Sequence, residues 1–150
     1  MHKDIDEIIN KLNIVNNIEY ENINIQNKKN NSIIYINKRI NNNKNIRIFG
    51  NKFVENNKND CFIYINGIKK EICEYYKLSI KEEKEEYIYI QLEMDDKVID
   101  MSDMFNDCIY LFSLPKNISK WVSSKVVNLS NMFKNCENLT SLSNIEEWNI

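Results

Sequence analysis

The chain of 150 residues contains 20 lysines and arginines and 22 aspartates and glutamates, which gives a formal net charge of −2 at pH 7. Because the basic residues are scattered, this balance argues against nucleic acid or an anionic membrane surface as a partner. Hydrophobic residues make up 43% and aromatic residues 11% of the chain. That content suffices for one packed domain, or for a small domain joined to a short repeat array.

Asparagine is abundant, with 27 copies against 2 glycines and 1 proline. We expect the asparagine runs to form polar, low-complexity loops rather than binding motifs. The N-terminal stretch lacks a basic segment followed by an apolar one, so it predicts no secretory signal. No apolar run approaches the roughly 18 residues that a membrane helix needs. These features predict a cytoplasmic chain without a membrane span; the alternative is a cell-surface location as part of a longer protein.

Residues 1–18 are predicted to form a short amphipathic helix. Asp4, Asp6 and Glu7 suit the positive end of a helix dipole. The apolar residues recur at helical spacing and are Ile5, Ile8, Ile9, Leu12 and Val15. We expect this helix to pack against the domain that follows it; a partner-binding or coiled-coil segment is the alternative.

Residues 19–97 are predicted to form a β-rich capping domain. Asn66-Gly67 predicts a tight hairpin turn that folds 62–65 back onto 68–73, because both residue types tolerate positive φ. Residues 52–55 are expected to form a helical turn, and 71–78 fit either a short helix or a strand. Several β-branched and aromatic runs alternate with the period of two that is typical of a sheet with one solvent face. These predicted strands are 33–36, 46–49, 61–65 and 87–92.

Two segments near the C-terminus repeat one pattern. They read VIDMSDMFNDCIYLFSLPKNISKW over 98–121 and VVNLSNMFKNCENLTSLSNIEEW over 126–148. The copies are offset by about 28 residues, with a slip of about one residue before the tryptophan that ends each. Such a period predicts two stacked repeats, 98–125 and 126–150, each of which needs a neighbour to bury its apolar face.

Within each repeat, the apolar residues predict a short helix followed by a short strand. Residues at i, i+3, i+4 and i+7 share one helical face, with Ser102 and Ser130 near the start of the helix. Leucines then alternate with polar residues over 110–114 and 138–142, and we expect these strands to pair in parallel. The predicted repeat core comprises Met101, Met104, Phe105, Cys108, Leu111, Leu114, Leu129, Met132, Phe133, Cys136, Leu139 and Leu142.

The pattern V-x-[DN]-[ML]-S-x-M-F-x-x-C-x-x-L-x-S-L followed by I-x-x-W resembles the BspA-like leucine-rich repeat family over residues 98–148. The resemblance implies a leucine-rich-repeat solenoid and a place among proteins that act mostly at cell surfaces by binding other proteins. The chain departs from the family in two ways. It shows no signal or lipid anchor, which argues against a surface location, and it has only two repeats, which predicts a truncated array or a degenerate paralogue. Trp121 and Trp148 are expected to pack against a neighbouring coil; an exposed aromatic ladder is the alternative.

The sequence shows no arrangement of residues that is suited to catalysis or to binding a cofactor. The only histidine, His2, lies at the N-terminus, so no Ser-His or Cys-His pair is expected. Gly50 and Gly67 cannot form a phosphate-binding loop, and the acids over 95–103 lack the spacing of a calcium loop. We therefore predict no catalytic residue, no metal and no cofactor.

The four cysteines lack the C-x-x-C spacing of a zinc site. Cys108 and Cys136 share one phase of the repeat, which predicts two small buried core residues. A disulfide between Cys61 and Cys73 requires an oxidising compartment, which the missing signal peptide disfavours.

Together these features predict an α+β fold. An N-terminal helix and a small β-rich domain precede the start of a leucine-rich-repeat solenoid, with a short helix and a short parallel strand in each repeat. The predicted function is non-enzymatic recognition of an unidentified protein partner. The alternatives are a structural cap for a longer repeat array and a hydrolase-like enzyme hidden in the β domain. The expected contact surface is the strand-bearing side of the repeats, at Tyr110, Phe112, Ser113, Asn138, Thr140 and Ser141.

Overall fold

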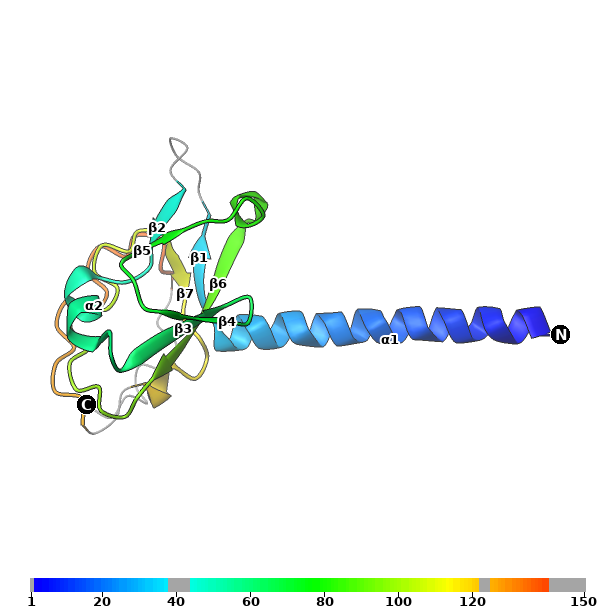
Figure 1. Ribbon diagram of the computed structural model, residues 1–150, viewed down its shortest axis with the longest axis horizontal. Coiled ribbons are helices and arrows are strands. Elements are labelled where there is room, and N and C mark those ends of the chain that lie inside the picture. The colour runs from blue at the N-terminus through cyan, green and yellow to red at the C-terminus, as the bar shows by residue number, and fades with distance from the viewer. Residues whose placement is uncertain (1, 38–43, 122–124, 141–150) are drawn as a thin grey trace.

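A computed structural model describes residues 2–37, 44–121 and 125–140, and shows a β-rich domain from which one long helix projects (Figure 1). That helix, α1 (His2–Asn31), runs well beyond residue 18. The remaining elements are β1 (Ile33–Ile36), β2 (Asn45–Arg47), α2 (Asn51–Asn57), β3 (Cys61–Ile65), β4 (Ile68–Glu71), β5 (Tyr75–Lys77), the 3-10 turn η1 (Glu82–Lys84), β6 (Tyr87–Met94), β7 (Leu111–Ser113) and the 3-10 turn η2 (Ile118–Lys120).

Five strands form the main sheet in the order β4-β3-β6-β1-β7, and every neighbouring pair is antiparallel. Strands β2 and β5 form a second, two-stranded antiparallel sheet, so residues 75–77 are a strand rather than part of a helix. Isoleucines alternate along β3 and β6 and point to one face, where Ile63, Ile88 and Ile90 are buried. The predicted period-two pattern therefore marks the core side of this sheet.

The predicted hairpin at Asn66-Gly67 is confirmed. Strand β3 pairs with β4 in antiparallel register, with Ile65 opposite Ile68. Asn66 has φ 52° and Gly67 has φ 77°, the positive values that a two-residue hairpin turn requires.

Aromatic rings join the core of the β domain to the two repeats. Phe49 lies between Phe53 and Phe105, with ring centroids 5.4 and 5.7 Å away. Phe105 also stacks on Phe133, with the centroids 5.9 Å apart and the ring planes 10° from parallel. The first repeat is thus packed on both sides, against 49–53 and against the second repeat.

The predicted leucine-rich-repeat solenoid is wrong. Residues 101–108 and 129–136 form consecutive tight turns instead of short helices. Asp103, Asp107, Asn131 and Asn135 have φ between 55° and 60°, and a right-handed helix cannot continue through such residues. The apolar spacing that suggests a helical face is produced by these turns.

The expected parallel strands are also absent from the described residues. Strand β7 lies where the first was predicted, but it pairs antiparallel with β1 at the edge of the main sheet. Residues 138–140 form no strand, and 141–142 lie outside the described residues. In the part of the chain that the structure describes, parallel pairing is limited to one isolated bridge between Asp100 and Asn128.

The two turn segments nevertheless stack directly on each other. The amide N–H groups of Met101, Asp103, Phe105 and Asp107 donate to the carbonyl oxygens of Asn128, Ser130, Met132 and Lys134, each over 2.9 Å. We call these four bonds the turn ladder. The repeat detected in the sequence is therefore a repeat of turns, and in the turn ladder the first copy donates and the second accepts.

Candidate functional site

The outer side of the five-stranded sheet carries aromatic side chains where charged ones are usual. Aromatic residues alternate with the buried residues of β3 and of the first half of β6, and they are half-buried. One aromatic residue of β7 is half-buried as well. We call this surface the aromatic face: Phe62, Tyr64, Tyr87, Tyr89 and Phe112. An aromatic ring that stays partly in water has unused apolar area for a partner to cover.

The centre of the aromatic face is a shallow hollow between three strands. The rings of Tyr87 and Phe112 lie 5.3 Å apart, and Ile34 sits opposite Tyr89 in the register of β1 and β6. These four residues line a cavity of about 190 Å³. Such a volume accommodates a single apolar side chain rather than a whole small-molecule ligand, since ligand pockets generally run from about 300 Å³ upward.

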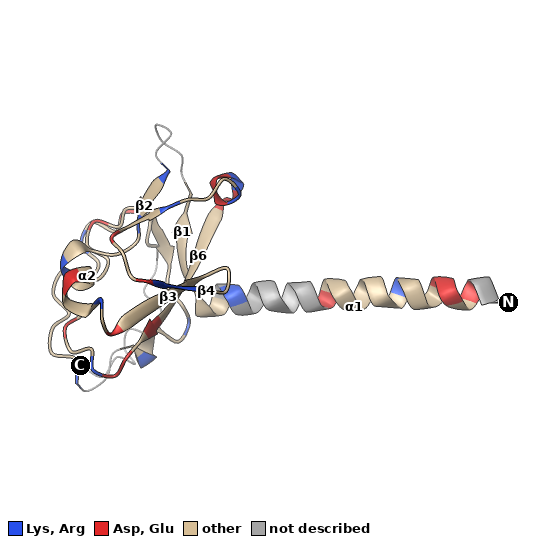
Figure 2. Cartoon of the chain, in the orientation of Figure 1, with Lys and Arg blue, Asp and Glu red and all other residues tan. Residues whose placement is uncertain are grey.

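Lysines border the aromatic face. The ammonium group of Lys69, on the basic strand β4 (Figure 2), lies 4.4 Å from the Phe62 ring centroid and 5.8 Å from that of Tyr64. Lys28 lies 4.9 Å above the Tyr89 ring. Cation–π contacts of this kind hold the rings in place. Lys69 also forms a 3.6 Å ion pair with Glu93, so part of the positive charge at the rim is already neutralised. The face therefore combines apolar area with a partly basic border.

A second hollow of about 640 Å³ adjoins the aromatic face at the base of α1. It is lined by Lys28, Ser32, Tyr64, Asn66, Gly67, Tyr89 and Gln91. The Tyr64 hydroxyl donates to a carboxylate oxygen of Glu93 over 2.7 Å, so its polar end is already satisfied. Burial, with the nearby Tyr87, Glu85 and Glu86, raises the pKa of Tyr89.

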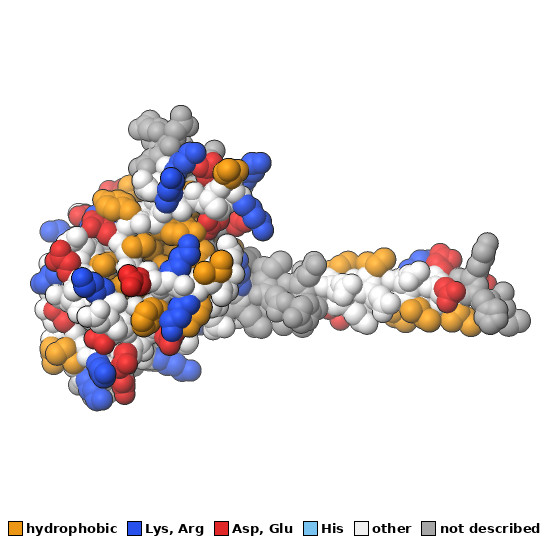
Figure 3. Space-filling view, in the orientation of Figure 1, with side chains coloured by type: hydrophobic (Ala, Val, Ile, Leu, Met, Phe, Trp, Pro, Cys, Tyr) orange, Lys and Arg blue, Asp and Glu red, His pale blue; other side chains and the backbone are white. Residues whose placement is uncertain are grey.

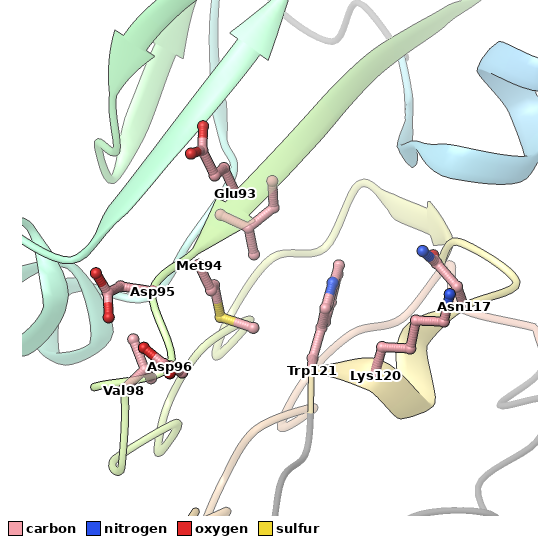
Figure 4. Close-up of a pocket in the computed structure, with 9 residues that line it drawn as sticks. Glu93, Met94, Asp95, Asp96, Val98, Asn117, Lys120 and Trp121 are labelled. Atoms are coloured by element: carbon pink, nitrogen blue, oxygen red, sulfur yellow. The ribbon is translucent and has the colours of Figure 1, made fainter.

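A third hollow, of about 360 Å³, lies between the end of β6 and the segment around η2 (Figure 4). Asp95 and Asp96 lie on one side, and Asn117, Lys120 and Trp121 on the other. The backbone N–H of Lys97 donates to Asp95 over 2.9 Å, and this bond lowers the pKa of that carboxyl. The two walls thus carry opposite charges, but the lining has no histidine or nucleophile suited to catalysis.

The turn ladder begins at a capped edge. The carbonyls of Asp100, Met104 and Asn106 in the first repeat correspond to carbonyls that accept ladder bonds in the second repeat. Each of these three accepts a hydrogen bond from a residue of the 47–57 segment. Gly50 N–H donates to Met104 over 2.9 Å, and the Asn57 side-chain amide donates to Asp100 over 2.8 Å. The guanidinium Nε of Arg47 donates to the Asn106 carbonyl over 3.1 Å. The donors on 47–57 thus occupy the place that a preceding turn segment would take.

Two features fix this cap in position. The Arg47 guanidinium forms a 2.5 Å ion pair with Glu74, which aims its other nitrogen at the turn. A Cβ added at Gly50 would lie 1.9 Å from the carbonyl oxygen of Asp103. Because that neighbour is backbone, only glycine allows the approach.

The structure disperses the predicted contact residues. Phe112 lies on the aromatic face, and Ser113 pairs with Ile34 on β1. Tyr110 is half-buried, and its carbonyl accepts from the Ile36 N–H. Asn138 donates to the carbonyl of Ile109, which ties the second repeat to the first. Thr140 is exposed, and Ser141 lies outside the described residues.

Sequence reasoning missed four of the five aromatic-face residues. The signal was present in Tyr87-Ile88-Tyr89-Ile90 and in Phe62-Ile63-Tyr64-Ile65, where aromatic residues alternate with isoleucine. Because the isoleucines are buried, the aromatics occupy the side that was expected to be polar.

The predicted repeat core is buried unevenly. In the first repeat, Met101, Met104, Phe105, Cys108 and Leu111 are fully buried, whereas Leu114 is half-buried. In the second repeat, Met132 is buried, and the half-buried residues are Leu129, Phe133, Cys136 and Leu139. The half-buried Trp121 ring lies 6.4 Å from Phe105. Leu142 and Trp148 lie outside the described residues.

All four cysteines are free thiols. Burial raises the pKa of Cys61 to about 12 and that of Cys136 to about 11. Cys136 donates from its sulfur to the Phe105 carbonyl over 3.1 Å. Among the described residues, no three histidine, cysteine or acidic side chains gather closely enough to hold a metal ion.

A family described as "Mycoplasma protein of unknown function, DUF285" matches residues 88–150, which span most of β6 and both repeats. No curated protein and no solved structure matches the chain. In the described part of the chain, no helix combines the length and apolar character needed to cross a membrane.

Proposed function

We propose that this chain is a non-enzymatic protein-binding module whose contact surface is the aromatic face. The observation that supports it best is the cluster of half-exposed rings around the hollow of Ile34, Tyr87, Tyr89 and Phe112. Aromatic residues are enriched where proteins contact each other, because they offer large, rigid area at a low cost in conformational entropy. The one predicted contact residue on this face, Phe112, lies at the hollow.

The border of the face indicates the chemistry of the partner. An apolar side chain fits the hollow, and carboxylates beside it would meet Lys28 at the rim and compete with Glu93 for Lys69. We therefore expect the partner to be a protein segment that combines one large apolar residue with flanking acidic residues.

A displayed library of random peptides provides the test, because it samples many sequences without assuming a partner. We expect selection on the wild-type protein to enrich acidic peptides with an apolar centre. Phe112→Ala and Tyr89→Ala should each weaken binding of the enriched peptides by about tenfold or more, as loss of a hot-spot residue at the centre of an interface does. Ile80→Ala, at an exposed apolar residue outside the face, is the matched control and should leave affinity unchanged.

Two outcomes would contradict the proposal. One is the enrichment of peptides whose affinity is insensitive to Phe112→Ala and Tyr89→Ala while both variants remain folded by circular dichroism. The other is that the folded wild-type protein enriches no peptide.

A second candidate function is a structural cap for a longer array of turn repeats. It is supported by the donors of Arg47, Gly50 and Asn57 on the first turn segment. If capping is the whole function, Asn57→Ala will lower stability, and no substitution on the aromatic face will change binding to any probe.

A further inference from the structure

Ser32, which joins the end of α1 to the start of β1, carries a buried hydroxyl that makes no hydrogen bond. Its side chain is completely buried, and the described residues offer its Oγ no hydrogen-bond partner. Buried polar groups are nearly always paired, because an unpaired one has lost its bonds to water and gained none in return. The Ser32 hydroxyl is therefore available to a group from outside the fold.

Ser32 also lines the second hollow, of about 640 Å³ at the base of α1, which we call the polar hollow. Pockets for small ligands generally have volumes of about 300–1,000 Å³, so the polar hollow is large enough to hold one. Three parts of the chain enclose it: the end of α1, the Asn66-Gly67 turn of the β3–β4 hairpin, and the strands β3 and β6 (Figure 1). The polar hollow thus results from the way α1 leaves the sheet beside this hairpin.

Lys28 is the one charged residue among those that line the polar hollow. Its ammonium group lies 4.9 Å from the centroid of the Tyr89 ring, and the ion pairs of the described residues do not include it. The remaining polar side chains of the lining carry hydroxyl or amide groups, all of which can donate hydrogen bonds. A cation among neutral donors favours an anion as the ligand.

The acids near the polar hollow do not cancel this preference. Glu93, near the end of β6, accepts from the Tyr64 hydroxyl over 2.7 Å and pairs with Lys69 over 3.6 Å, so its charge is partly offset. Glu85 and Glu86 precede β6 and do not line the hollow. Lysine side chains also lie over β4, beside the base of α1 (Figure 3). The lining itself therefore remains positive.

We propose that the polar hollow is a carboxylate-binding site. Lys28 supplies the charge, while Ser32 and the side-chain amides of Asn66 and Gln91 donate hydrogen bonds to the carboxylate. Lys28 precedes Ser32 by four residues, so the two lie on one side of the helix end. Because the hydroxyl is covered in the free protein, the carboxylate meets it once the long, flexible Lys28 side chain turns from the Tyr89 ring to the ligand.

The source of the carboxylate follows from the position of the polar hollow, and here the inference rests on the protein-binding function proposed above. Tyr89 lines both the polar hollow and the apolar hollow of the aromatic face. The apolar hollow extends from β6 toward β1 and β7, and the polar hollow extends from β6 toward β3 and α1. Two strand spacings separate them, roughly 10 Å, which about three residues of an extended segment span. The carboxylate is thus that of an aspartate or glutamate about three residues from the apolar residue of the same partner segment.

Two-dimensional NMR of the full chain tests the site without a partner. The probe is N-acetyl-glutamate methylamide, which has one carboxylate, and N-acetyl-glutamine methylamide is its neutral counterpart. The carboxylate probe should shift the side-chain amide signals of Asn66 and Gln91 with a millimolar Kd, as expected for so small a ligand, and the neutral probe should not. Lys28→Gln should weaken this binding about tenfold. Lys69→Gln, which removes a lysine outside the lining, is the matched control and should leave it unchanged. A carboxylate probe that shifts neither amide signal overturns the proposal.

Ser32→Ala separates a binding role from a structural one. Since the hydroxyl has no partner in the fold, its removal should leave the Tm unchanged or raise it, while binding of the carboxylate probe weakens about tenfold. A lowered Tm would show that the hydroxyl is paired within the fold, and an unchanged affinity would show that it does not reach the ligand. Either result overturns the proposal.

Acid-to-amide variants of the peptides enriched by display decide the source of the carboxylate. Each peptide should lose about tenfold in affinity when its acid becomes an amide, and the Lys28→Gln protein should no longer distinguish the two forms. If the enriched peptides depend on Phe112 but not on Lys28 or Ser32, the protein-binding function stands and the carboxylate site is wrong. If the small probe binds through Lys28 and Ser32 but no peptide depends on Phe112, the site holds a free carboxylate and the protein-binding function fails. Tighter binding of inorganic phosphate than of the carboxylate probe would assign the polar hollow to a phosphate group and overturn the proposal.

Discussion

The two repeats share a sequence pattern and a backbone conformation, yet they differ in burial. Asp103 and Asp107 in the first repeat, and Asn131 and Asn135 in the second, adopt the same positive φ. Phe105 is fully buried, whereas its counterpart Phe133 is half-buried. The difference lies in the neighbours, because the first repeat has the 47–57 segment on one side and the second repeat on the other. Local sequence therefore sets the turns, and the position in the stack sets the stability of each copy.

The largest effect on stability should come from removing the Phe105 ring, which contacts both Phe49 and the second repeat. Phe105→Ala leaves a cavity beside Phe49 and Phe133, and should lower the free energy of unfolding by about 3–5 kcal/mol. Phe133→Ala should cost about half as much, because that ring is partly in solvent. Urea denaturation measures the free energy of unfolding of both variants. Equal losses would contradict the inference that the position of a copy in the stack sets its stability.

The cap should be the next most sensitive point. Gly50→Ala forces a methyl group against the Asp103 carbonyl and should cost about 2–3 kcal/mol, the upper part of the usual range for overpacking. Gly67→Ala is the control: nothing lies within 4 Å of the added carbon, and only its positive φ is strained, so about 1 kcal/mol is expected. Thermal unfolding should rank the two variants in that order, and the reverse order would show that the close approach at Gly50 is not required.

The left-handed residues offer a finer comparison. Asn131→Ala should cost up to about 1 kcal/mol from backbone strain alone, whereas Asn131→Gly should be nearly neutral. Asp103→Ala should cost more than Asn131→Ala, since the Asp103 carboxylate also accepts from the Asn106 amide over 3.1 Å. If alanine is tolerated at residue 131 as well as glycine, the turn does not depend on positive φ there.

The smallest effect is a difference in thiol reactivity. Burial raises the pKa of Cys108 further than that of Cys136, and neighbouring Cys136 adds to the shift at Cys108. Because the thiolate is the reactive form, Cys136 should alkylate faster than Cys108 in the native protein. Both rates should keep rising as the pH increases past 9, the ordinary thiol value, since a raised pKa delays ionisation. Mass spectrometry after timed iodoacetamide treatment measures the two sites, and equal rates would show that the repeats open together.

Period-two patterns and turn residues predicted much of the β domain. Strands β1 and β3, the larger part of β6, and the Asn66-Gly67 hairpin all lie where alternation and positive-φ residues placed them. These features depend on neighbours in sequence, so one sequence suffices to find them.

The repeats were harder because their apolar spacing fits two structures. Met101, Met104, Phe105 and Cys108 suit one face of a helix, but they suit a series of turns equally well. Asp103 and Asp107 decide between the two, since acidic and amide residues tolerate positive φ better than most others. The aromatic face was missed for a different reason: which side of a strand meets the core depends on packing between distant segments.

The turn ladder also determines where the chain can change length. Each of the four amides in the turn ladder pairs with a carbonyl 27 residues later, from Met101 with Asn128 to Asp107 with Lys134. An insertion within 101–107 would shift every later bond of the ladder. One at 116–117 would leave the ladder in register and disturb instead the connection between the copies, including the 2.9 Å bond from the Lys116 N–H to the Asn30 carbonyl. The one-residue slip between the copies, which falls after Leu114 and before Trp121, already lies in that connection. Length variation among similar sequences should therefore gather between the turns and spare the turns themselves.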